Sequence, residues 1–377
     1  LDTDANGEPI PTTFVYKITE TGTNDGIKND KFVHTVEVKV SYDEAHPTVL
    51  KVEPTYKSAG YVISDGFSKF TNTRQTGELE LTKTVTGTDD TQKEFVFNIS
   101  GALLAKKTYK YILTDKDGNP RTETDITFDA TGSQDVTLKA GEKILIKNLP
   151  DKTSYTITEK TVPDGYSIVN PESGNSMIGE IVAGETQYAD FVNTYRAEGK
   201  VSFKAQKELT NGTLAGKTFT VRLSQVTGNN STTAITGSAS KIPTPLVRTF
   251  SATDGTAEFT DVVTFVKNKD QDDSAAGKNV YWFLLEEIIP DEAVNNILDG
   301  VKYVQNRTWI SVTVTDNKNG TLKIEKSPNK EIDVTFTNEQ MGSVKVTKAV
   351  TGDLTLADLP EAFKITATYQ DATNTTH

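Results

Sequence analysis

The sequence predicts an all-β protein made of tandem Ig-like β-sandwiches arranged as an elongated rod. Three observations support this fold class: apolar and polar residues alternate along most segments, turn-forming residues separate those segments, and three strand-like motifs recur in the same order along the chain. Many short alternating strands with turns between them are typical of two packed sheets.

Composition excludes several classes of protein. The 377-residue chain has a formal net charge of -12 and no cysteine. The acidic balance argues against nucleic acid as a partner, because phosphates bind basic surfaces. Without cysteine there are no disulfides and no thiolate metal sites. No apolar run approaches the roughly 20 residues that span a bilayer, and no signal peptide opens the chain, so we expect no membrane span in this segment.

The alternation is clearest in residues 95–99, 219–223 and 309–314, which we predict to be strands. Turn-forming residues bound such segments, as in the Asp-Gly-Asn-Pro stretch at residues 117–120. Only one segment, the short acidic stretch of residues 291–298, predicts a helix.

Residues 199–340 contain three strand-like runs in which one polar residue interrupts an apolar row. Side chains two apart along a strand share a face, so Lys207, Glu287 and Asn338 are predicted to face the core. Glu286 is the alternative acid, but Glu287 continues the apolar row of its strand. A buried charge is costly unless it is paired, so the three groups are expected to meet.

The same order of Lys, Glu and Asn occurs elsewhere in the chain. One further set is complete and two are partial, and their members are Lys83, Glu159 and Asn193; Glu20 and Asn72; and Lys348. A single such residue is usually solvated, and a lysine at the edge of an apolar row usually extends to solvent. The repeated order favours a shared role instead.

These sets divide the chain into four parts. Residues 1–73 predict the C-terminal part of a β-sandwich, residues 74–196 and 197–340 two complete β-sandwiches, and residues 341–377 the N-terminal fragment of a further one. The junctions are short and polar, which predicts a semi-rigid rod. The two end fragments together are shorter than a complete module, so we expect truncation or flanking sequence rather than a module shared between copies.

Burial makes a reaction between the three groups feasible. In water a lysine amine with a pKa of about 10.4 and a glutamic acid with a pKa of about 4.3 are both charged. Burial lowers the pKa of the amine and raises that of the acid. A neutral amine can then attack the amide carbon while the acid polarises the amide oxygen and carries protons. Ammonia leaves, and the product is a neutral isopeptide bond.

Two known families share these motifs. Residues 81–87, 155–166 and 191–195 resemble the collagen-adhesin B-type domain of Gram-positive surface proteins, and the middle run is similar to the pilin E-box. Residues 200–339 and 1–73 are similar to the streptococcal pilin isopeptide-linkage domain, in which Phe-x-Asn follows the Glu-bearing row.

The resemblance implies specific cross-links and assigns the glutamates as the catalytic acids. These are Lys83 with Asn193 beside Glu159; Lys207 with Asn338 beside Glu287; Asn72, beside Glu20, with a Lys upstream of this sequence; and Lys348 with an Asn downstream of it. Each acid would act once, so we expect no enzyme, no cofactor and no metal.

The resemblance also implies a structural role on the surface of a Gram-positive bacterium. The chain would be part of a cell-wall-attached extracellular fibre, either a pilus backbone or an adhesin stalk, with further copies or neighbouring domains of the same fibre as partners. An adhesin that binds a host ligand through exposed loops, such as residues 228–247, is the alternative. The sequence has no Leu-Pro-x-Thr-Gly sorting signal, so polymerisation by sortase has no support from it.

Overall fold

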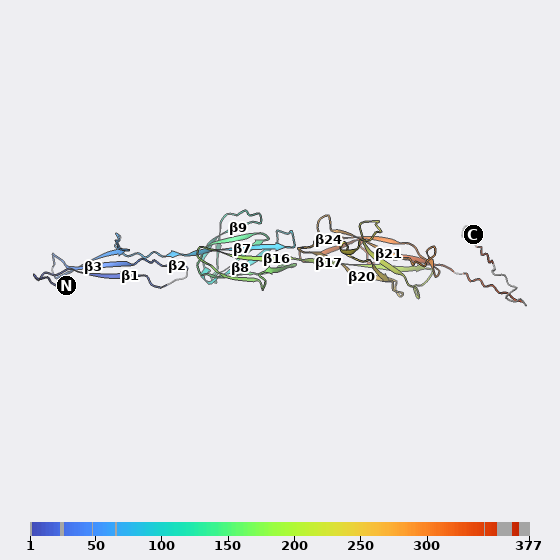
Figure 1. The fold of residues 1–377 in the computed structure, drawn as a ribbon, viewed down its shortest axis with the longest axis horizontal. Coiled ribbons are helices and arrows are strands. Elements are labelled where there is room, and N and C mark those ends of the chain that lie inside the picture. The colour runs from blue at the N-terminus through green and yellow to red at the C-terminus, as the bar shows by residue number, and fades with distance from the viewer. Residues whose placement is uncertain are drawn as a thin grey trace.

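The computed structural model describes residues 2–22, 26–46, 48–64, 66–342, 344–352 and 364–368. These residues form an elongated rod of successive β-sheets (Figure 1), and the prediction of an all-β fold is confirmed. Two sandwiches occupy the middle of the rod, and an open sheet precedes them at the N-terminal end.

The N-terminal part, residues 2–74 and here called the head, is a single layer. Its main sheet has the strand order β1-β3-β4-β5, and a two-stranded ribbon, β2-β6, links it to the first sandwich. The strands are β1 (Thr12–Ile18), β2 (Ile27–Lys28), β3 (His34–Tyr42), β4 (Leu50–Ser58), β5 (Tyr61–Val62) and β6 (Thr73–Arg74).

One face of the head sheet is apolar; it is exposed along β1 and buried at Val36 and His34 of β3. Phe14, Tyr16 and Ile18 alternate along β1 and are 49%, 57% and 37% exposed. They pair across the antiparallel ladder with Val38, Val36 and His34 of β3. Among the residues that the structure describes, no second sheet packs over this face.

The first sandwich packs a six-stranded sheet on a four-stranded one. The six-stranded sheet has the order β10-β9-β12-β7-β16-β14 and the other has the order β11-β8-β13-β15. Their strands are β7 (Thr76–Thr86), β8 (Glu94–Ser100), β9 (Thr108–Thr114), β10 (Thr124–Thr127), β11 (Ser133–Lys139), β12 (Lys143–Pro150), β13 (Ser154–Glu159), β14 (Tyr166–Asn170), β15 (Ser176–Glu180) and β16 (Thr186–Tyr195).

The second sandwich packs two five-stranded sheets. Their orders are β20-β17-β26-β23-β22 and β19-β18-β21-β24-β25. The strands are β17 (Ala197–Thr210), β18 (Thr220–Val226), β19 (Leu246–Thr249), β20 (Thr256–Lys267), β21 (Val280–Ile288), β22 (Ile297–Leu298), β23 (Val301–Lys302), β24 (Arg307–Asp316), β25 (Leu322–Ser327) and β26 (Val334–Gln340).

Alternation along the strands builds both cores. In β7 every second residue is buried, so Leu79 and Leu81 face the core and the residues between them do not. Phe97 of β8 packs edge to face on Phe191 of β16, with ring centroids 5.0 Å apart. Of the three segments predicted as strands, residues 95–99 and 309–314 lie in β8 and β24, and residues 219–223 lie in β18 except for Phe219, which precedes it.

The first and last strands of each sandwich are parallel neighbours. β7 pairs with β16 in a register that sets Lys83 opposite Phe191. β17 pairs with β26, and Lys207 lies opposite Phe336. Each sandwich is therefore closed by two strands that are adjacent in space and distant in sequence.

The predicted helix at residues 291–298 is wrong. The segment forms turns and ends in β22, and a bridge joins Val294 to Ile297. Asn295 and Asn296 have φ angles of 50° and 64°, in the left-handed region that asparagine tolerates but a helix does not use. The described helical segments are two 3-10 turns, η1 (Ala102–Leu104) and η2 (Gly237–Ala239). In the described part of the chain, no helix has the length and apolarity needed to cross a membrane.

The two sandwiches meet at a short, bonded junction. Only Arg196 separates β16 from β17. The hydroxyl of Tyr195 donates to Asp316 Oδ1 at 2.7 Å and accepts from the backbone N–H of Gly320 at 3.2 Å. Gly165 packs so closely on Gly320 that an added Cβ would lie 2.5 Å from the Gly320 nitrogen. These contacts tie the loops of one sandwich to those of the next.

Candidate functional site

In the first sandwich Lys83, Glu159 and Asn193 meet inside the core. Lys83 lies on β7 and Asn193 on the adjacent β16, whereas Glu159 reaches them from β13 in the facing sheet. Lys83 Nζ donates to Glu159 Oε2 at 3.0 Å, and Asn193 Nδ2 donates to Glu159 Oε1 at 2.6 Å. All three residues are fully buried. One carboxyl group thus bridges the amine and the amide.

The second sandwich repeats this arrangement. Lys207 lies on β17, Asn338 on the adjacent β26 and Glu287 on β21 of the facing sheet. Lys207 Nζ donates to Glu287 Oε2 at 3.2 Å, and Asn338 Nδ2 donates to Glu287 Oε1 at 2.8 Å. Lys207 Nζ also donates to the backbone oxygen of Phe336 at 3.2 Å. The structure brings together all the residues that the sequence selected for the two complete sets.

Burial favours the neutral forms of the two lysines and of Glu287, which are the forms that bond formation requires. Desolvation lowers the pKa of Lys83 to about 8, although the charge of Glu159 and its hydrogen bond oppose the shift. Desolvation also lowers the pKa of Lys207 and raises that of Glu287, against their mutual attraction. A low dielectric disfavours both charges, so the neutral amine and neutral acid become accessible.

Aromatic rings surround the amines. Lys83 Nζ lies 4.2 Å from the ring centroid of Phe95 and 5.6 Å from that of Phe97. Lys207 Nζ lies 4.8 Å from the ring centroid of Phe219. These rings exclude water from the amine. Sequence reasoning identified their strands but not this role, because an apolar alternation has the same pattern whether or not a polar group faces it.

The sequence predicted that the acid contacts the amide oxygen of the asparagine, and the structure differs. In the second sandwich Asn338 Oδ1 accepts a hydrogen bond from the backbone N–H of Val304 at 3.1 Å, while the acid contacts the amide nitrogen. In the first sandwich Asn193 Oδ1 is buried and has no hydrogen-bond partner among the described residues. The sequence did not identify Val304 as a site residue, because its backbone N–H, and not its side chain, contacts Asn338.

The two adjacent glutamates of β21 point to opposite faces. Glu287 faces the core with Lys207, whereas Glu286 binds Arg222 Nη2 at 2.7 Å and Arg307 Nε at 3.1 Å. Glu286 is therefore part of a peripheral ion-pair network. Strand alternation selected the residue that contacts Lys207 and Asn338.

The two partial sets, Glu20 with Asn72 and Lys348 alone, lie in different parts of the structure. In the head, Asn72 Nδ2 donates to Glu20 Oε1 at 2.7 Å. Lys348 lies in the tail, residues 344–352, beyond the second sandwich and outside any strand. The structure therefore brings Glu20 and Asn72 together and does not bring Lys348 to them.

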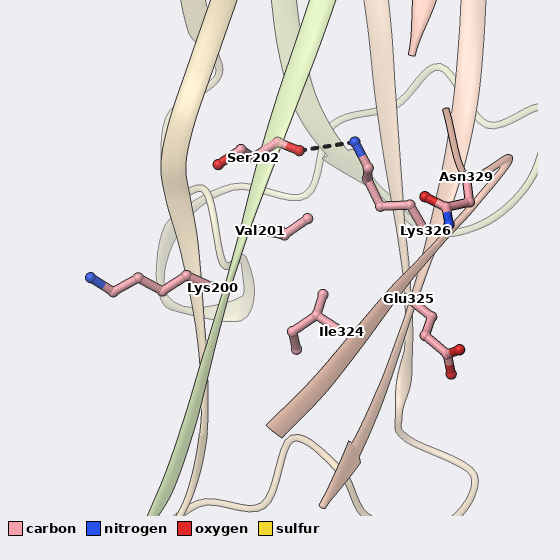
Figure 2. Close-up of a pocket in the computed structure, with 7 residues that line it drawn as sticks. All are labelled: Lys200, Val201, Ser202, Ile324, Glu325, Lys326 and Asn329. Carbon is pink, nitrogen blue, oxygen red and sulfur yellow. Dashed lines mark hydrogen bonds between the residues drawn. The ribbon is translucent and has the colours of Figure 1, made fainter. Parts of the chain in front are cut away.

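Surface hollows lie apart from the buried groups. One hollow of about 290 Å³ lies between β17 and β25 (Figure 2), and Lys200, Ser202 and Lys326 contribute to its lining. Lys326 Nζ spans it, donating to the backbone oxygen of Ser202 at 3.2 Å. None of the residues lining this hollow belongs to a Lys, Glu and Asn set. Within the described ranges, no three His, Asp or Glu side chains are grouped so as to hold a metal ion.

The fold and the buried groups define a tandem β-sandwich stalk protein in which each complete sandwich encloses one Lys, one Glu and one Asn. The profile of the Spy0128-like isopeptide containing domain matches residues 4–75 and 203–341, more than half of the chain. The chain belongs to this family, and the predicted relationship to Gram-positive pilin isopeptide domains is confirmed. Residues 77–195 match a domain of unknown function, DUF7601, so their resemblance to the collagen-adhesin B-type domain stays a prediction.

Solved structures of pilus proteins are among the similar chains. The major pilin from Streptococcus pyogenes is 23% identical with a TM-score of 0.39, over 49% of this chain and 70% of that one. The major pilin T3.2 of Streptococcus pyogenes serotype GAS13637 is 21% identical with a TM-score of 0.36, over 49% and 68% of the two chains. A search among curated proteins finds no match. The family assignment rests on the profile match.

Proposed function

We propose that this chain is a structural component of a bacterial cell-surface fibre, stabilised by two self-generated isopeptide bonds, Lys83 to Asn193 and Lys207 to Asn338. The observation that carries the proposal is the carboxyl bridge, in which Glu159 and Glu287 each contact both the amine and the amide nitrogen. This geometry occurs twice, on equivalent strands of separate sandwiches.

The carboxyl bridge supports a proton-shuttle mechanism. The glutamate oxygen that contacts the amine takes one proton from Nζ, and the neutral amine attacks Cγ of the asparagine. The other glutamate oxygen then delivers that proton to Nδ2, and the Cγ–Nδ2 bond breaks. The attacking nitrogen gives up its second proton on becoming an amide N–H, and the departing ammonia takes this proton and leaves as ammonium. In the second sandwich the N–H of Val304 stabilises the negative charge that develops on Oδ1. Each acid returns to its starting protonation state and acts once.

The position of each bond supports a role under tension. Force applied to the ends of a sandwich enters through its first strand and leaves through its last, and these strands are parallel neighbours. A bond between them carries that force directly. The hydrogen bonds between the remaining strands then bear little load.

Family membership supports the rest of the proposal. Membership in the family of Spy0128-like isopeptide domains supports a location at the surface of a Gram-positive bacterium, where the chain would be a pilus backbone or stalk segment and its partners other subunits or domains of the same fibre. The sheet topology supports the division into an N-terminal part at residues 1–73 and sandwiches at 74–196 and 197–340, and the assignment of residues 341–377 to a further sandwich stays a prediction from the sequence.

Intact-mass measurement tests the bonds directly. The purified chain is expected to be lighter than its calculated mass by one ammonia for each complete sandwich. Glu159→Gln is expected to restore one ammonia, and peptide mapping of the wild-type protein is expected to find Lys83 joined to Asn193. A wild-type protein with its full calculated mass would contradict the proposal.

A further inference from the structure

A crossover segment, residues 289–304 and here called the arm, connects the two sheets of the second sandwich beside its buried site. The arm leaves β21 soon after Glu287, adds β22 and β23 to the sheet that carries Asn338, and returns to the first sheet in β24. β23 pairs antiparallel with the last two residues of β26, Glu339 and Gln340. The arm therefore docks on the last strand directly next to Asn338.

The end of the arm supplies a hydrogen-bond donor to the site. The ladder between β23 and β26 ends at Lys302, and the N–H of Val304 then donates to the side-chain Oδ1 of Asn338 at 3.1 Å. In the proposed reaction this N–H faces the oxygen on which negative charge develops. The stabilisation that Val304 gives therefore depends on how the arm is held.

The arm has a backbone conformation that its residues do not favour on their own. Asn295, Asn296 and Asp299 have φ angles of 50°, 64° and 48°, and Gly300 follows at 73°. Left-handed angles cost free energy for residues other than glycine, and they persist where surrounding contacts enforce them. Contacts with the rest of the sandwich must therefore hold the arm in place.

Gln340 provides such a contact at the turn before β23. Its Nε2 donates to the backbone oxygen of Gly300 at 2.9 Å and to that of Met341 at 3.4 Å. Two carbonyl oxygens around one atom require a donor at that position, which a carboxylate does not supply. An added Cβ at Gly300 would lie 3.0 Å from Nε2 of Gln340, so the two residues are closely packed. The side chain of Gln340 therefore fixes the start of β23.

Tyr303 anchors the other end of the arm. Its backbone N–H donates to the oxygen of Asn296 at 2.7 Å, and its buried ring lies 5.8 Å from that of Phe219 between centroids. The ring of Phe219 is also the one that lies 4.8 Å from Lys207 Nζ. Val304 follows Tyr303 directly, so its N–H is held between the anchored ring and the turn at Gly300.

The first sandwich surrounds its asparagine differently. Ile168 of β14 lies opposite Asn193 in the ladder, and Asn193 Oδ1 has no hydrogen-bond partner among the described residues. The two sites share the lysine, the acid and the amide, but the arm contacts the second site. The first site is therefore an internal control in the same chain.

We propose that the arm gates bond formation in the second sandwich, and that Gln340 is the positioning residue that holds the N–H of Val304 against Asn338. This inference rests on the proposed function, because it concerns the rate of the same reaction. While Gln340 and Gly300 are apart, the N–H of Val304 is displaced from Oδ1. The attack of Lys207 Nζ on the amide carbon then lacks its stabilising donor, so the cross-link forms only after the arm has docked on β26.

Peptide mass spectrometry over time on newly synthesised full-length chains tests the gate. Gln340→Glu keeps the size of the side chain but turns an acceptor toward two carbonyl oxygens. It is expected to slow the second bond by about 10-fold or more and to leave the rate of the first bond unchanged. Glu339→Gln, whose exposed side chain lies on the other face of β26, is the matched control and is expected to keep both rates. Equal rates in Gln340→Glu and the wild type, or equal slowing of both bonds, overturn the proposal.

A second variant changes the same contact from the side of the arm. Gly300→Ala strains a left-handed position and crowds Gln340, so it is expected to slow the second bond as well. Two residues that act through one contact are not additive, so the double variant is expected to react no more slowly than the slower single variant. Fully additive slowing would show that the two residues act separately, and it would overturn the gate.

Stability measurements separate a positioning role from a purely structural one. In a Glu287→Gln chain, which is expected to form no second bond, adding Gln340→Glu should change the melting temperature of the second sandwich by only a few degrees. A second sandwich that is unfolded at the temperature of the rate measurement would attribute the slowing to unfolding and overturn the gate. If the wild-type chain loses ammonia from both sandwiches and Gln340→Glu reacts as fast, the gate fails and the proposed function stands. If the wild-type chain loses none, both fail.

Discussion

Replacing Glu287 by Gln measures what the proposed bond between Lys207 and Asn338 contributes to the stability of the second sandwich. The substitution keeps the size of the side chain and its contact with Asn338, but an amide does not take a proton from Lys207 and deliver it to the leaving nitrogen. The second sandwich is therefore expected to fold without its cross-link, while the first sandwich keeps its own. Intact mass should rise by one ammonia relative to the wild-type chain.

The expected loss of stability follows from chain entropy. A cross-link that closes a loop of about 100 residues removes about 4.7 kcal/mol of unfolded-state freedom. At about 4 °C per kcal/mol for a domain of this size, the melting temperature of the second sandwich is expected to fall by about 15 to 20 °C. Lys207 stays buried without its acid in the variant, which adds to the loss.

Calorimetry with a matched control measures this effect. The wild-type chain and the variant are compared for the transition of the second sandwich, and Glu286→Gln is the control because Glu286 binds Arg222 and Arg307 on the other face of β21. Glu286→Gln is expected to retain the ammonia deficit. A Glu287→Gln chain that regains ammonia and melts within a few degrees of the wild type would refute the link between the bond and stability.

Three further predictions concern the mechanism and the junction. In the proposed mechanism Glu159 passes one proton from Lys83 to the leaving nitrogen of Asn193. The rate of bond formation in newly synthesised chains is therefore expected to fall as the pH rises above about 8, where Lys83 loses that proton to solvent. A rate that stays constant to pH 10 would contradict the proton shuttle. Val304→Pro removes the N–H that contacts Asn338 and is expected to slow bond formation in the second sandwich by about 100-fold or more, as followed by mass spectrometry over time. Tyr195→Phe removes two hydrogen bonds at the junction, which is expected to lower the free energy of unfolding by about 1 to 3 kcal/mol and to broaden the distribution of rod shapes in small-angle scattering. Tyr188→Phe, at an exposed position, should leave the stability and the distribution of shapes unchanged.

Period-two alternation was sufficient to predict which polar side chains face the core. Lys83, Glu159 and Asn193 continue apolar rows of three strands, and burial of those rows forces the three groups together. The same alternation separated Glu287 from Glu286, which has equal charge and faces the opposite side of the sheet.

The alternation of apolar and polar residues does not predict the geometry of loops and turns. The N–H of Val304 contacts Asn338 because a loop returns to the last strand, and no side chain marks that event. Residues 291–298 have helix-forming acidic and apolar residues, but Asn295 and Asn296 adopt left-handed angles that suit turns. The first feature depends on a contact distant in sequence, which local propensity does not encode, and the second on a local turn preference of asparagine that the helix prediction did not weigh.

The two proposed bonds together determine how far the rod could stretch. Tension would pass through Lys83 and Asn193, along β16 and β17, and through Lys207 and Asn338, so the chain loaded between the two bonds is residues 193–207. A strand already rises about 3.3 Å per residue, close to the reach of a fully extended chain, so this segment has almost no length to release. Without the bonds, each sandwich would release a loop of about 100 residues, or about 300 Å. A fibre that must hold its length under force gains more from this arrangement than from stability alone.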